Sequence, residues 1–382
     1  MRLSSIVSEA LRNIAQGTSR AVLLALAVFV CSGLLGGYEM ASVLALEKQA
    51  ANRIQADADV KVIVGAPIDG AACDNLAIST WKQTNGSSSA NGPSISGALR
   101  DGPQITPTST PGRDVTSYEA TPGLLHLLAE HATTTGRRNV DKANFVSVDA
   151  TGIWVPTDLA NDFGLSVGSR FETTSGITTV AGIYQWPNDG RDTRLAYAVI
   201  TPVSASNGTF DECWARQWPV SNDTDRLLYS TAIITDGTEQ GAAGITQLNK
   251  GFDSQYDALG SYLTRMTRWM PALGLMIGVL LGVLSVHRRR LEYAGALHSG
   301  QTKGAQLLEL AVETWIWAGI GTLCAIIILF AAGYRLSIAD SMAITITAIR
   351  TSVALFSGTT VAAICAGACI RESQLFRYFK KR

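Results

Sequence analysis

Cysteine and histidine are the residues here whose chemistry depends most on spacing, and the chain has six Cys and four His. Two cysteines, Cys73 and Cys213, lie outside the apolar segments described below. In an oxidising compartment such a pair can form a disulfide, and two buried thiols are the alternative. The other four lie within apolar segments and are interpreted as small packing residues: Cys31, Cys324, Cys365 and Cys369.

The histidines do not form a metal-binding pattern. His126 and His131 are five positions apart, so on one helix their side chains would point about 140° apart, and we interpret both as facing solvent. The sequence has no HExxH, CxxC or GxSxG motif and no GxxxxGK[ST] phosphate-binding loop. We therefore expect no catalytic residue, no metal site and no bound cofactor, and a chain that is not itself an enzyme.

Four apolar segments are long enough to cross a bilayer as helices: residues 21–38, 269–286, 310–333 and 351–370. The composition, with 47% hydrophobic and 16% charged residues, argues against a purely soluble or a disordered protein. Because 31 basic residues balance 31 acidic ones, nucleic-acid binding is not expected. For the first segment a cleaved signal peptide is the alternative, although its apolar stretch would be unusually long.

The distribution of basic residues indicates the orientation of these spans. Segments 1–20, 287–304 and 371–382 together contain twelve Lys and Arg but only three acidic residues. Short segments rich in Lys and Arg stay on the cytoplasmic side, so we expect both termini in the cytoplasm. Residues 47–268 then lie outside the cell membrane, with 17 basic and 24 acidic residues.

The fold expected is an α-helical membrane protein with four transmembrane helices and a large mixed α/β extracytoplasmic domain on helical stalks. An apolar stripe predicts an interfacial amphipathic helix in 1–20. Stalk helices are expected at 39–51, which lacks Gly and Pro, and at 246–268, with the α/β domain at 52–245 between them. The remaining segments are a cytoplasmic coupling segment at 287–309, a short outer loop at 334–350 and a basic cytoplasmic tail at 371–382.

Local patterns place elements within the α/β domain. A Ser-, Gly- and Pro-rich composition predicts a long loop over 84–113. A helix is expected over 122–132, with Pro122 at its first position. A second short helix is expected over 157–164. Strands are expected at 57–64, 145–154, 170–174, 178–184 and 195–201.

Glycine spacing suggests close helix packing within two spans. Gly33 and Gly37 are four apart in the first span, and the second carries Gly274, Gly278 and Gly282 at the same interval. Such a face lets another helix backbone approach closely. Packing within one subunit and a seam between two subunits are both compatible with this pattern.

Two segments resemble a known family. Residues 288–319 read RRRLEYAGALHSGQTKGAQLLELAVETWIWAG, and they are similar to the "RRREIG…RALGAS" cytoplasmic segment of the MacB/FtsX-type (type VII) ABC transporter permeases. Residues 152–189 are similar to that family's extracytoplasmic signature, a strand and a helix ending in "GL.VGD" followed by two strands and a "GI" turn. Topology agrees over the whole chain, while motif similarity covers about a fifth of it.

The resemblance implies a bacterial permease subunit that pairs with a second permease chain, identical or different, and binds two copies of a separate ABC ATPase. ATP and Mg²⁺ would bind to that partner, and the outer domain would transmit motion to a cargo or an adaptor protein. The implied cargo is a peptide, a lipoprotein or an amphiphile. The ATPase would contact the coupling segment at six positions: Leu291, Glu292, Gly295, Ala296, Leu297 and His298.

Two alternatives remain open at this point. An FtsX-like subunit would regulate a cell-wall hydrolase without transporting anything, and a receptor or sensor would work with no ATPase. His298, Ser299 and Gly300 depart from the Gly-Ala-Ser of the family segment, and 65–120 matches no pattern that identifies a ligand.

Overall fold

The computed structural model describes residues 3–16, 20–83, 93–132, 148–221, 223–233, 243–337 and 341–371. The chain divides into two compact units. The first contains Met1–Lys48 and Gly260–Arg382, and the second contains Gln49–Leu259. Both ends of the sequence thus build one unit, and the middle of the sequence builds the other.

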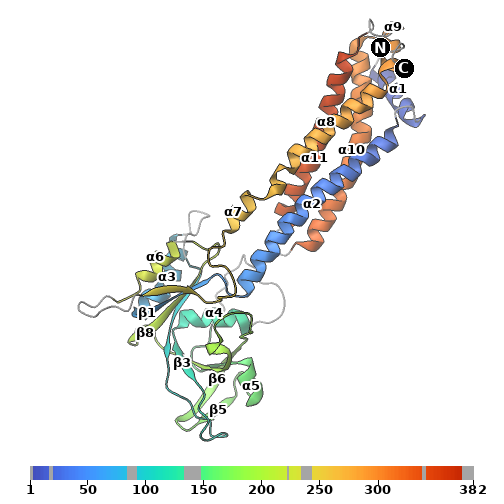
Figure 1. Cartoon of the computed structure of the whole chain (residues 1–382). Coiled ribbons are helices and arrows are strands. Elements are labelled where there is room, and N and C mark those ends of the chain that lie inside the picture. Colours follow the sequence, from blue (N-terminus) through green and yellow to red (C-terminus); the bar gives the residue numbers. More distant parts are fainter. Residues whose placement is uncertain are drawn as a thin grey trace. The chain divides into compact units, whose positions relative to one another are not determined.

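The first unit is helical (Figure 1). Its helices are α1 (Leu3–Ala15), α2 (Ala21–Gln55, which continues into the second unit), the 3₁₀ helix η3 (Met266–Trp269), α8 (Met270–Arg288), α9 (Arg290–His298), α10 (Lys303–Leu336) and α11 (Ser341–Cys369). Among the described residues, four helical segments are long and apolar enough to cross a membrane: Ala21–Gln55, Ala258–Arg288, Lys303–Leu336 and Ser341–Cys369. The four transmembrane helices expected from the sequence are present.

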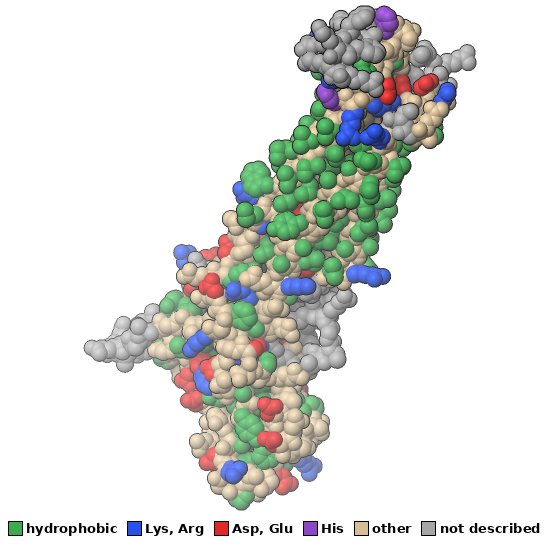
Figure 2. All heavy atoms as spheres, turned by 45° about the vertical axis from the view of Figure 1, so that its right-hand side comes forward, with side chains coloured by type: hydrophobic (Ala, Val, Ile, Leu, Met, Phe, Trp, Pro, Cys, Tyr) green, Lys and Arg blue, Asp and Glu red, His purple; other side chains and the backbone are tan. Residues whose placement is uncertain are grey.

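Large apolar side chains point outward from these helices. Val22 is 84% exposed and Leu34 is 69% exposed, although both lie within an apolar segment. Figure 2 shows such side chains as a continuous hydrophobic band with Lys and Arg at both of its ends. An apolar surface bounded by basic residues suits a lipid environment, where exposing hydrocarbon costs nothing.

The second unit contains a mixed sheet of nine strands in the order β5-β6-β4-β7-β3-β2-β8-β1-β9. Most neighbours are antiparallel, whereas β3 with β7 and β4 with β6 are parallel pairs. The strands are β1 (Val60–Asp69), β2 (Ile95–Asp101), β3 (Ser117–Ala120), β4 (Ile153–Pro156), β5 (Arg170–Thr173), β6 (Gly176–Tyr184), β7 (Val199–Pro202), β8 (Thr209–Arg216) and β9 (Gly244–Gln247). The helices are α3 (Gly70–Gln83), α4 (Pro122–Ala132), α5 (Thr157–Asp162), the 3₁₀ helix η2 (Thr193–Tyr197), α6 (Asp223–Tyr229) and α7 (Ala258–Leu263, which reaches into the first unit).

Alternating side chains give this sheet two apolar faces, because successive residues of a strand point to opposite sides. In β8, Trp214 joins the core beneath α4, while Cys213 and Ala215 join the core that also contains Leu76 of α3. Helix α4 supplies four leucines to the first core, and all four are fully buried: Leu124, Leu125, Leu127 and Leu128. The central strands are therefore covered on both faces.

A close backbone approach fixes α4 against β2. A Cβ atom on Gly97 would lie 2.0 Å from the Leu124 nitrogen, and one on Gly123 would lie 2.0 Å from the Ser96 oxygen. Neither position can carry a side chain without separating the helix from the strand.

Two predictions in this part of the sequence were wrong. The segment 84–113 is not one long loop, because β2 (Ile95–Asp101) runs through it between β3 and β8. The strand predicted at 195–201 begins instead with η2, since the Asp192 side chain accepts a hydrogen bond from the Arg194 amide and favours a turn. The strand predicted at 145–154 overlaps β4 only at Ile153 and Trp154, because residues 148–152 are not in a strand and 145–147 lie outside the described residues.

The predicted stalk helix at 246–268 was also wrong. Thr246 pairs with β1 as part of β9, and only Ala258–Leu263 and Met266–Trp269 are helical. Asn249 accepts a hydrogen bond from the Gly251 amide, and Asp253 accepts one from the Gln255 amide. These local side-chain bonds compete with a helix. The stalk predicted at 39–51, by contrast, is helical throughout as part of α2.

The predicted outer loop at 334–350 was too long. Helix α10 continues to Leu336 and α11 begins at Ser341, so most of that segment is helical. Gly333 lets Thr345 pack directly against α10, because a Cβ there would lie 2.2 Å from the Thr345 hydroxyl oxygen.

Candidate functional site

Helix α9 (Arg290–His298) forms the segment that the sequence predicted as the ATPase contact. In the sequence, Gly295, Gly300 and Gly304 favour a short helix, a turn and a second helix over 288–306. The structure shows this arrangement, with the turn at Gly300 (φ +95°) and the second helix capped by Thr302. Tyr293 and Ala294 of α9 are buried with residues of α8, α10 and α11.

The six predicted contact residues differ in exposure. Glu292 and His298 are exposed, and the other four, Leu291, Gly295, Ala296 and Leu297, are half-buried. A Cβ added to Gly295 would meet no atom within 4 Å. Gly295 follows Glu292 by three positions, and Ser299 follows Gly295 by four, so the three residues lie on one face of the helix. Among the described residues, nothing packs over Gly295 on that face.

A buried ionic cluster, the α10 acid cluster, holds the start of α9. The Arg289 guanidinium donates to Glu313 at 2.5 Å and to Glu292 at 2.8 Å. The Asn13 amide of α1 donates to both Glu309 and Glu313 at 2.8 Å. The cluster therefore fixes α1 and the first turn of α9 to α10. In the sequence, Glu309 and Glu313 stand only as acids at the start of the third span, and their partners were missed.

The glycines of the second span pack within the chain. Gly274, Gly278 and Gly282 are buried in α8. A Cβ on Gly278 would lie 2.2 Å from the Leu355 oxygen, and one on Gly282 would lie 2.4 Å from the Thr359 oxygen, both in α11. Of the two alternatives for these three glycines, the structure shows packing within one subunit, because α11 occupies the face.

The glycines of the first span are different. A Cβ on Gly33 or Gly37 would meet no atom within 4 Å. The glycine of α2 that allows close packing within the chain is Gly36, because a Cβ there would lie 2.8 Å from a methyl carbon of Leu329 in α10. A subunit seam at Gly33 and Gly37 stays a prediction.

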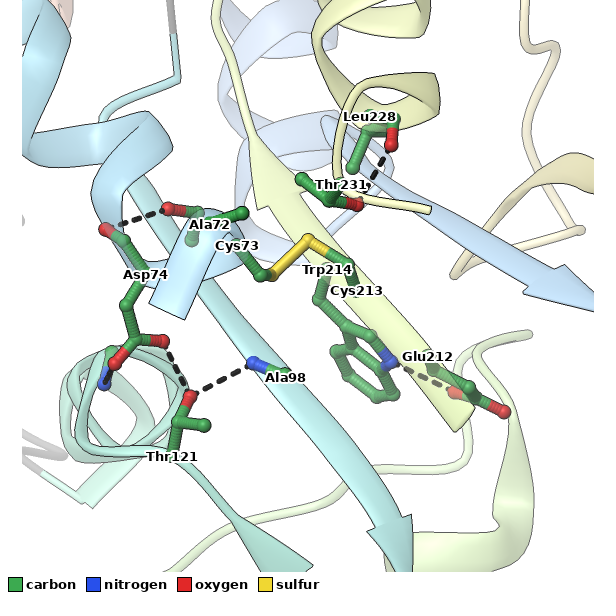
Figure 3. The surroundings of a disulfide bond; sticks show 12 residues. Ala72, Cys73, Asp74, Ala98, Thr121, Glu212, Cys213, Trp214, Leu228 and Thr231 are labelled. Atoms are coloured by element: carbon green, nitrogen blue, oxygen red, sulfur yellow. Dashed lines mark hydrogen bonds between the residues drawn. A yellow bond between two sulfur atoms is a disulfide. The ribbon is translucent and has the colours of Figure 1, made fainter. Parts of the chain in front are cut away.

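Cys73 and Cys213 form a disulfide between α3 and β8, with Cα atoms 5.9 Å apart (Figure 3). Both residues are fully buried in the core that α3 and α6 cover. The bond closes a loop of 140 residues, so it removes much of the freedom of the unfolded chain. The remaining cysteines of the structure are free: Cys31, Cys324, Cys365 and Cys369.

A half-buried carboxylate, that of Asp74, lies beside the disulfide (Figure 3). The Thr121 hydroxyl donates to Asp74 at 2.5 Å and accepts from the Ala98 amide at 2.8 Å. Burial raises the pKa of the Asp74 carboxyl, and the hydrogen bonds from Thr121 and the Gly123 amide oppose that shift. Asp74 thus ties α3 to the start of α4.

The end of α2 enters the second unit through a second buried cluster, the Asp57 cluster, which the sequence did not reveal. Asp57 is fully buried with φ +53°. Its carboxylate accepts from Arg191 at 2.6 Å and from Arg216. Arg216 also pairs with Glu130 of α4. A single Asp directly after a helix gives no sequence signal of such partners.

Side chains of this cluster also cap the last turn of α2. The Arg191 guanidinium donates to the Gln55 oxygen at 3.2 Å, and the Asn249 amide donates to the Ala56 oxygen at 2.8 Å. Two residues before Gln55, Arg53 donates to the Asp253 oxygen at 3.0 Å and lies over the Tyr256 ring, 3.9 Å from its centre. Since the final carbonyls of a helix lack partners of their own, these bonds fix the helix end to the sheet.

The described residues hold no group of three or more His, Cys, Asp and Glu side chains that could bind a metal ion. His126 lies on α4, where burial lowers the pKa of its imidazole and the Glu130 charge opposes that shift. It is half-buried rather than solvent-facing as predicted. The side chain of His131 lies outside the described residues.

No protein-family model matches the sequence, and no curated protein matches it. Two solved structures are similar over about half of the chain. The periplasmic region of MacB from Actinobacillus actinomycetemcomitans aligns at 10% identity and a TM-score of 0.30, covering 51% of this chain and 92% of that one. The extracellular domain of the noncanonic ABC-type transporter YknZ from Gram-positive bacteria aligns at 15% identity and a TM-score of 0.27, covering 48% and 97%.

Proposed function

We propose that this chain is the permease subunit of an ABC-type transporter that transmits ATP-driven motion mechanically. A separate ABC ATPase, two copies per assembly, would bind ATP and Mg²⁺ and contact α9 in the cytoplasm. The second unit would lie outside the membrane, and both termini inside. A second permease chain would complete the assembly, and a cargo or adaptor protein would bind outside. Export of a peptide, a lipoprotein or an amphiphile is the favoured use.

The observation that carries this proposal is the combination of an open face and a fixed base on α9. On that face Glu292 is exposed and pairs with Arg289, and a Cβ on Gly295 would meet no described atom within 4 Å. Tyr293 and the Arg289–Glu313 ion pair bind the helix to the membrane bundle. A force applied to that face would therefore reach α10 directly. Helix α2 and the Asp57 cluster provide the corresponding route into the second unit. Coupling of this kind requires an element that adopts two states, one of which binds the ATP-bound partner more tightly than the other.

The test is co-purification of the tagged full-length chain in mild detergent, followed by mass spectrometry. We expect a stoichiometric P-loop ATPase with the wild type and its loss with Glu292→Lys, which reverses the charge on the open face. Asp158→Lys is the matched control, since Asp158 is an exposed acid in the first turn of α5, and it should retain the ATPase.

Each alternative has its own result. An ATPase that accompanies the wild type together with a cell-wall hydrolase, but with no transported molecule, would favour the FtsX-like regulator. No ATPase from fresh membranes at low salt would favour a receptor. Retention of the ATPase by Glu292→Lys would show that the contact lies elsewhere.

A further inference from the structure

The first unit contains a buried carboxylate that belongs to none of the sites described above, that of Glu39 in α2. Glu39 directly follows the apolar segment 21–38 and is only 1% exposed. An ionisable side chain in a membrane span is costly unless a partner compensates its charge, and such residues usually mark a function. The partners of Glu39 therefore indicate what this residue does.

Two segments from elsewhere in the sequence bind this carboxylate. The Thr351 hydroxyl of α11 donates to one Glu39 oxygen at 2.5 Å. The Arg265 guanidinium lies 3.7 Å from the other oxygen, and its side chain is 9% exposed. Arg265 directly precedes η3 and belongs to residues 260–269, the returning segment, by which the chain re-enters the first unit. One carboxylate thus joins α2, α11 and the returning segment.

A second contact continues this attachment about one turn further along α2. Ser42 follows Glu39 by three positions, so both lie on one face of the helix. The hydroxyl of Thr267, which is 3% exposed, donates to the Ser42 hydroxyl at 3.2 Å. Arg265 is itself held in place, because its guanidinium donates to the Tyr262 oxygen at 2.7 Å and lies 3.9 Å from the centre of the Tyr262 ring. The returning segment is therefore attached to α2 at two points.

Thr351 also connects these contacts to α8. A Cβ on Gly274 of α8 would lie 3.0 Å from the Thr351 backbone oxygen, so α8 packs directly on α11 at this residue (Figure 1). Thr351 thus contacts α8 through its backbone and α2 through its hydroxyl. A displacement of α8 and α11 would therefore reach α2 at this level of the bundle.

We propose that Glu39, Arg265 and Thr351 form an intramembrane clamp through which α8, α11 and the returning segment move α2 with them. This role rests on the proposed function, in which the clamp is the point where α2 takes up the displacement that it carries to the second unit. A buried ion pair suits the task, because charges away from water are screened little and still attract when their distance changes slightly. The attachment itself needs no ATPase, since all of its residues belong to this chain.

The first measurement uses the full-length chain alone in nanodiscs. Glu39→Gln keeps an acceptor for Thr351 but removes the charge, so we expect amide hydrogen exchange of 264–270 to become roughly tenfold faster or more, as for a lost bond to a charged group. Glu39→Gln/Arg265→Gln leaves no uncompensated charge and should show the same acceleration, which separates the clamp from misfolding. Lys48→Gln is the matched control, because Lys48 is an exposed charge on the same helix, and it should exchange like wild type.

The second measurement adds the ATPase, with and without trapped ATP, and follows hydrogen exchange of 53–59. We expect an ATP-dependent change in wild type that Glu39→Gln lacks, although this variant still binds the ATPase. A covalent substitute for the clamp separates transmission from stability. Ser42→Cys and Thr267→Cys, in a chain whose four free cysteines are replaced by Ala, would be oxidised to a disulfide between the same two segments. Glu39→Gln in this background should lack the ATP response before oxidation and regain it afterwards.

Each contrary result has its own meaning. Unchanged exchange of 264–270 in both Gln variants would overturn the clamp. An ATP response of Glu39→Gln equal to that of wild type would overturn its role in transmission, and a response that oxidation does not restore would leave Glu39 a structural role only. No ATP response in wild type would contradict the proposed function and the transmission role with it, whereas the first measurement would still decide whether the clamp exists.

Discussion

At the scale of single residues, the most consequential side chains are buried charges that satisfy one another. Asp57 is the clearest case, since its carboxylate bridges two buried guanidinium groups, those of Arg191 and Arg216. Removing one partner of such a group leaves the others charged in a medium that solvates them poorly. The Asp57 cluster is therefore more sensitive to substitution than its size suggests.

We predict that Asp57→Asn lowers the free energy of unfolding of the second unit by about 3–5 kcal/mol. Asn tolerates the positive φ of this position, so the substitution removes the charge and leaves the backbone conformation accessible. Thermal unfolding followed by tryptophan fluorescence measures the effect. The comparison variant is Arg226→Ala, whose pair with Asp223 spans 3.8 Å between exposed side chains and should hardly matter. Equal melting temperatures for the two variants would contradict the prediction.

Asp74 makes stability depend on pH in a defined direction. Burial raises the pKa of its carboxyl in the folded state, so the folded protein holds this proton more tightly than the unfolded chain. The resulting stabilisation is fully present below the unfolded-state pKa and is lost as the pH rises through the folded-state pKa.

We therefore predict that Asp74→Asn, which is neutral at every pH, gains in melting temperature relative to wild type as the pH increases from 4 to 7.5. Thermal melts of both proteins across that range provide the test, and the difference between them cancels the other titrating groups. A difference that is constant with pH, or one that changes in the opposite direction, would show that the hydrogen bonds from Thr121 and Gly123 outweigh burial.

At the scale of elements, the packing of α8 on α11 depends on the absence of side chains. The three buried glycines of α8 place its backbone directly on the backbone of α11. Helix pairs in membranes rely on such close contacts, because lipid supplies no hydrophobic force between them.

We predict that Gly278→Leu prevents α8 from packing on α11 and yields a chain that aggregates or is degraded, since even a Cβ there would lie 2.2 Å from the Leu355 oxygen. The matched variant is Gly33→Leu in α2, where a Cβ meets no atom within 4 Å, and its chain should fold. Fluorescence-detected size-exclusion chromatography in detergent distinguishes the two. If folded Gly33→Leu elutes at half the mass of wild type, Gly33 lies in the subunit seam. Monodisperse Gly278→Leu would contradict the intrachain packing.

Element prediction from the sequence was accurate where one local pattern dominates. The helix over 122–132 was confirmed to the residue as α4, and strands β5 and β6 were found within two residues. Prediction was wrong where contacts with a segment distant in the sequence determine the secondary structure. Residues 95–101 contain Ser and Gly and resemble a loop, yet Gly97 is required there because α4 lies against it. Thr246 is helix-compatible by itself and becomes a strand residue through β1.

The candidate sites show the same limit. The cysteine pair was predicted because two residues leave a single pairing. The short helix, turn and second helix over 288–306 were predicted from Gly295, Gly300 and Gly304, which disfavour one uninterrupted helix. The Asp57 cluster was not, because Arg191, Arg216 and Asn249 lie more than 130 positions from Asp57 in the sequence. Only the fold brings them together, and a single sequence does not record such contacts.

At the scale of the whole molecule, α2 is the one helix that contributes long stretches to both units: the division falls between Lys48 and Gln49, while the helix runs from Ala21 to Gln55. The later connection through 248–259 contains turns and only the start of α7. If the proposed function holds, the stiffness of α2 matters more for transmission than any single contact. A helix is stiff only while its hydrogen-bond ladder is intact, and exposed Gly residues weaken that ladder.

We predict that Gly at Lys48, Gln49 and Asn52 uncouples the two units, whereas Ala at the same three positions does not. All three side chains are exposed, so both triple variants lose the same surface groups and no buried contact. Gly is less favourable than Ala in a helix by about 1 kcal/mol per residue, so the Gly variant should open this part of α2 roughly a hundredfold more often. The measurement is hydrogen–deuterium exchange of 53–59 and 247–253 in the complex with the ATPase, with and without trapped ATP. Wild type and the Ala variant should show an ATP-dependent change there, and the Gly variant should bind the ATPase yet show none. An equal ATP response in both variants would mean that motion reaches the second unit by another route than α2.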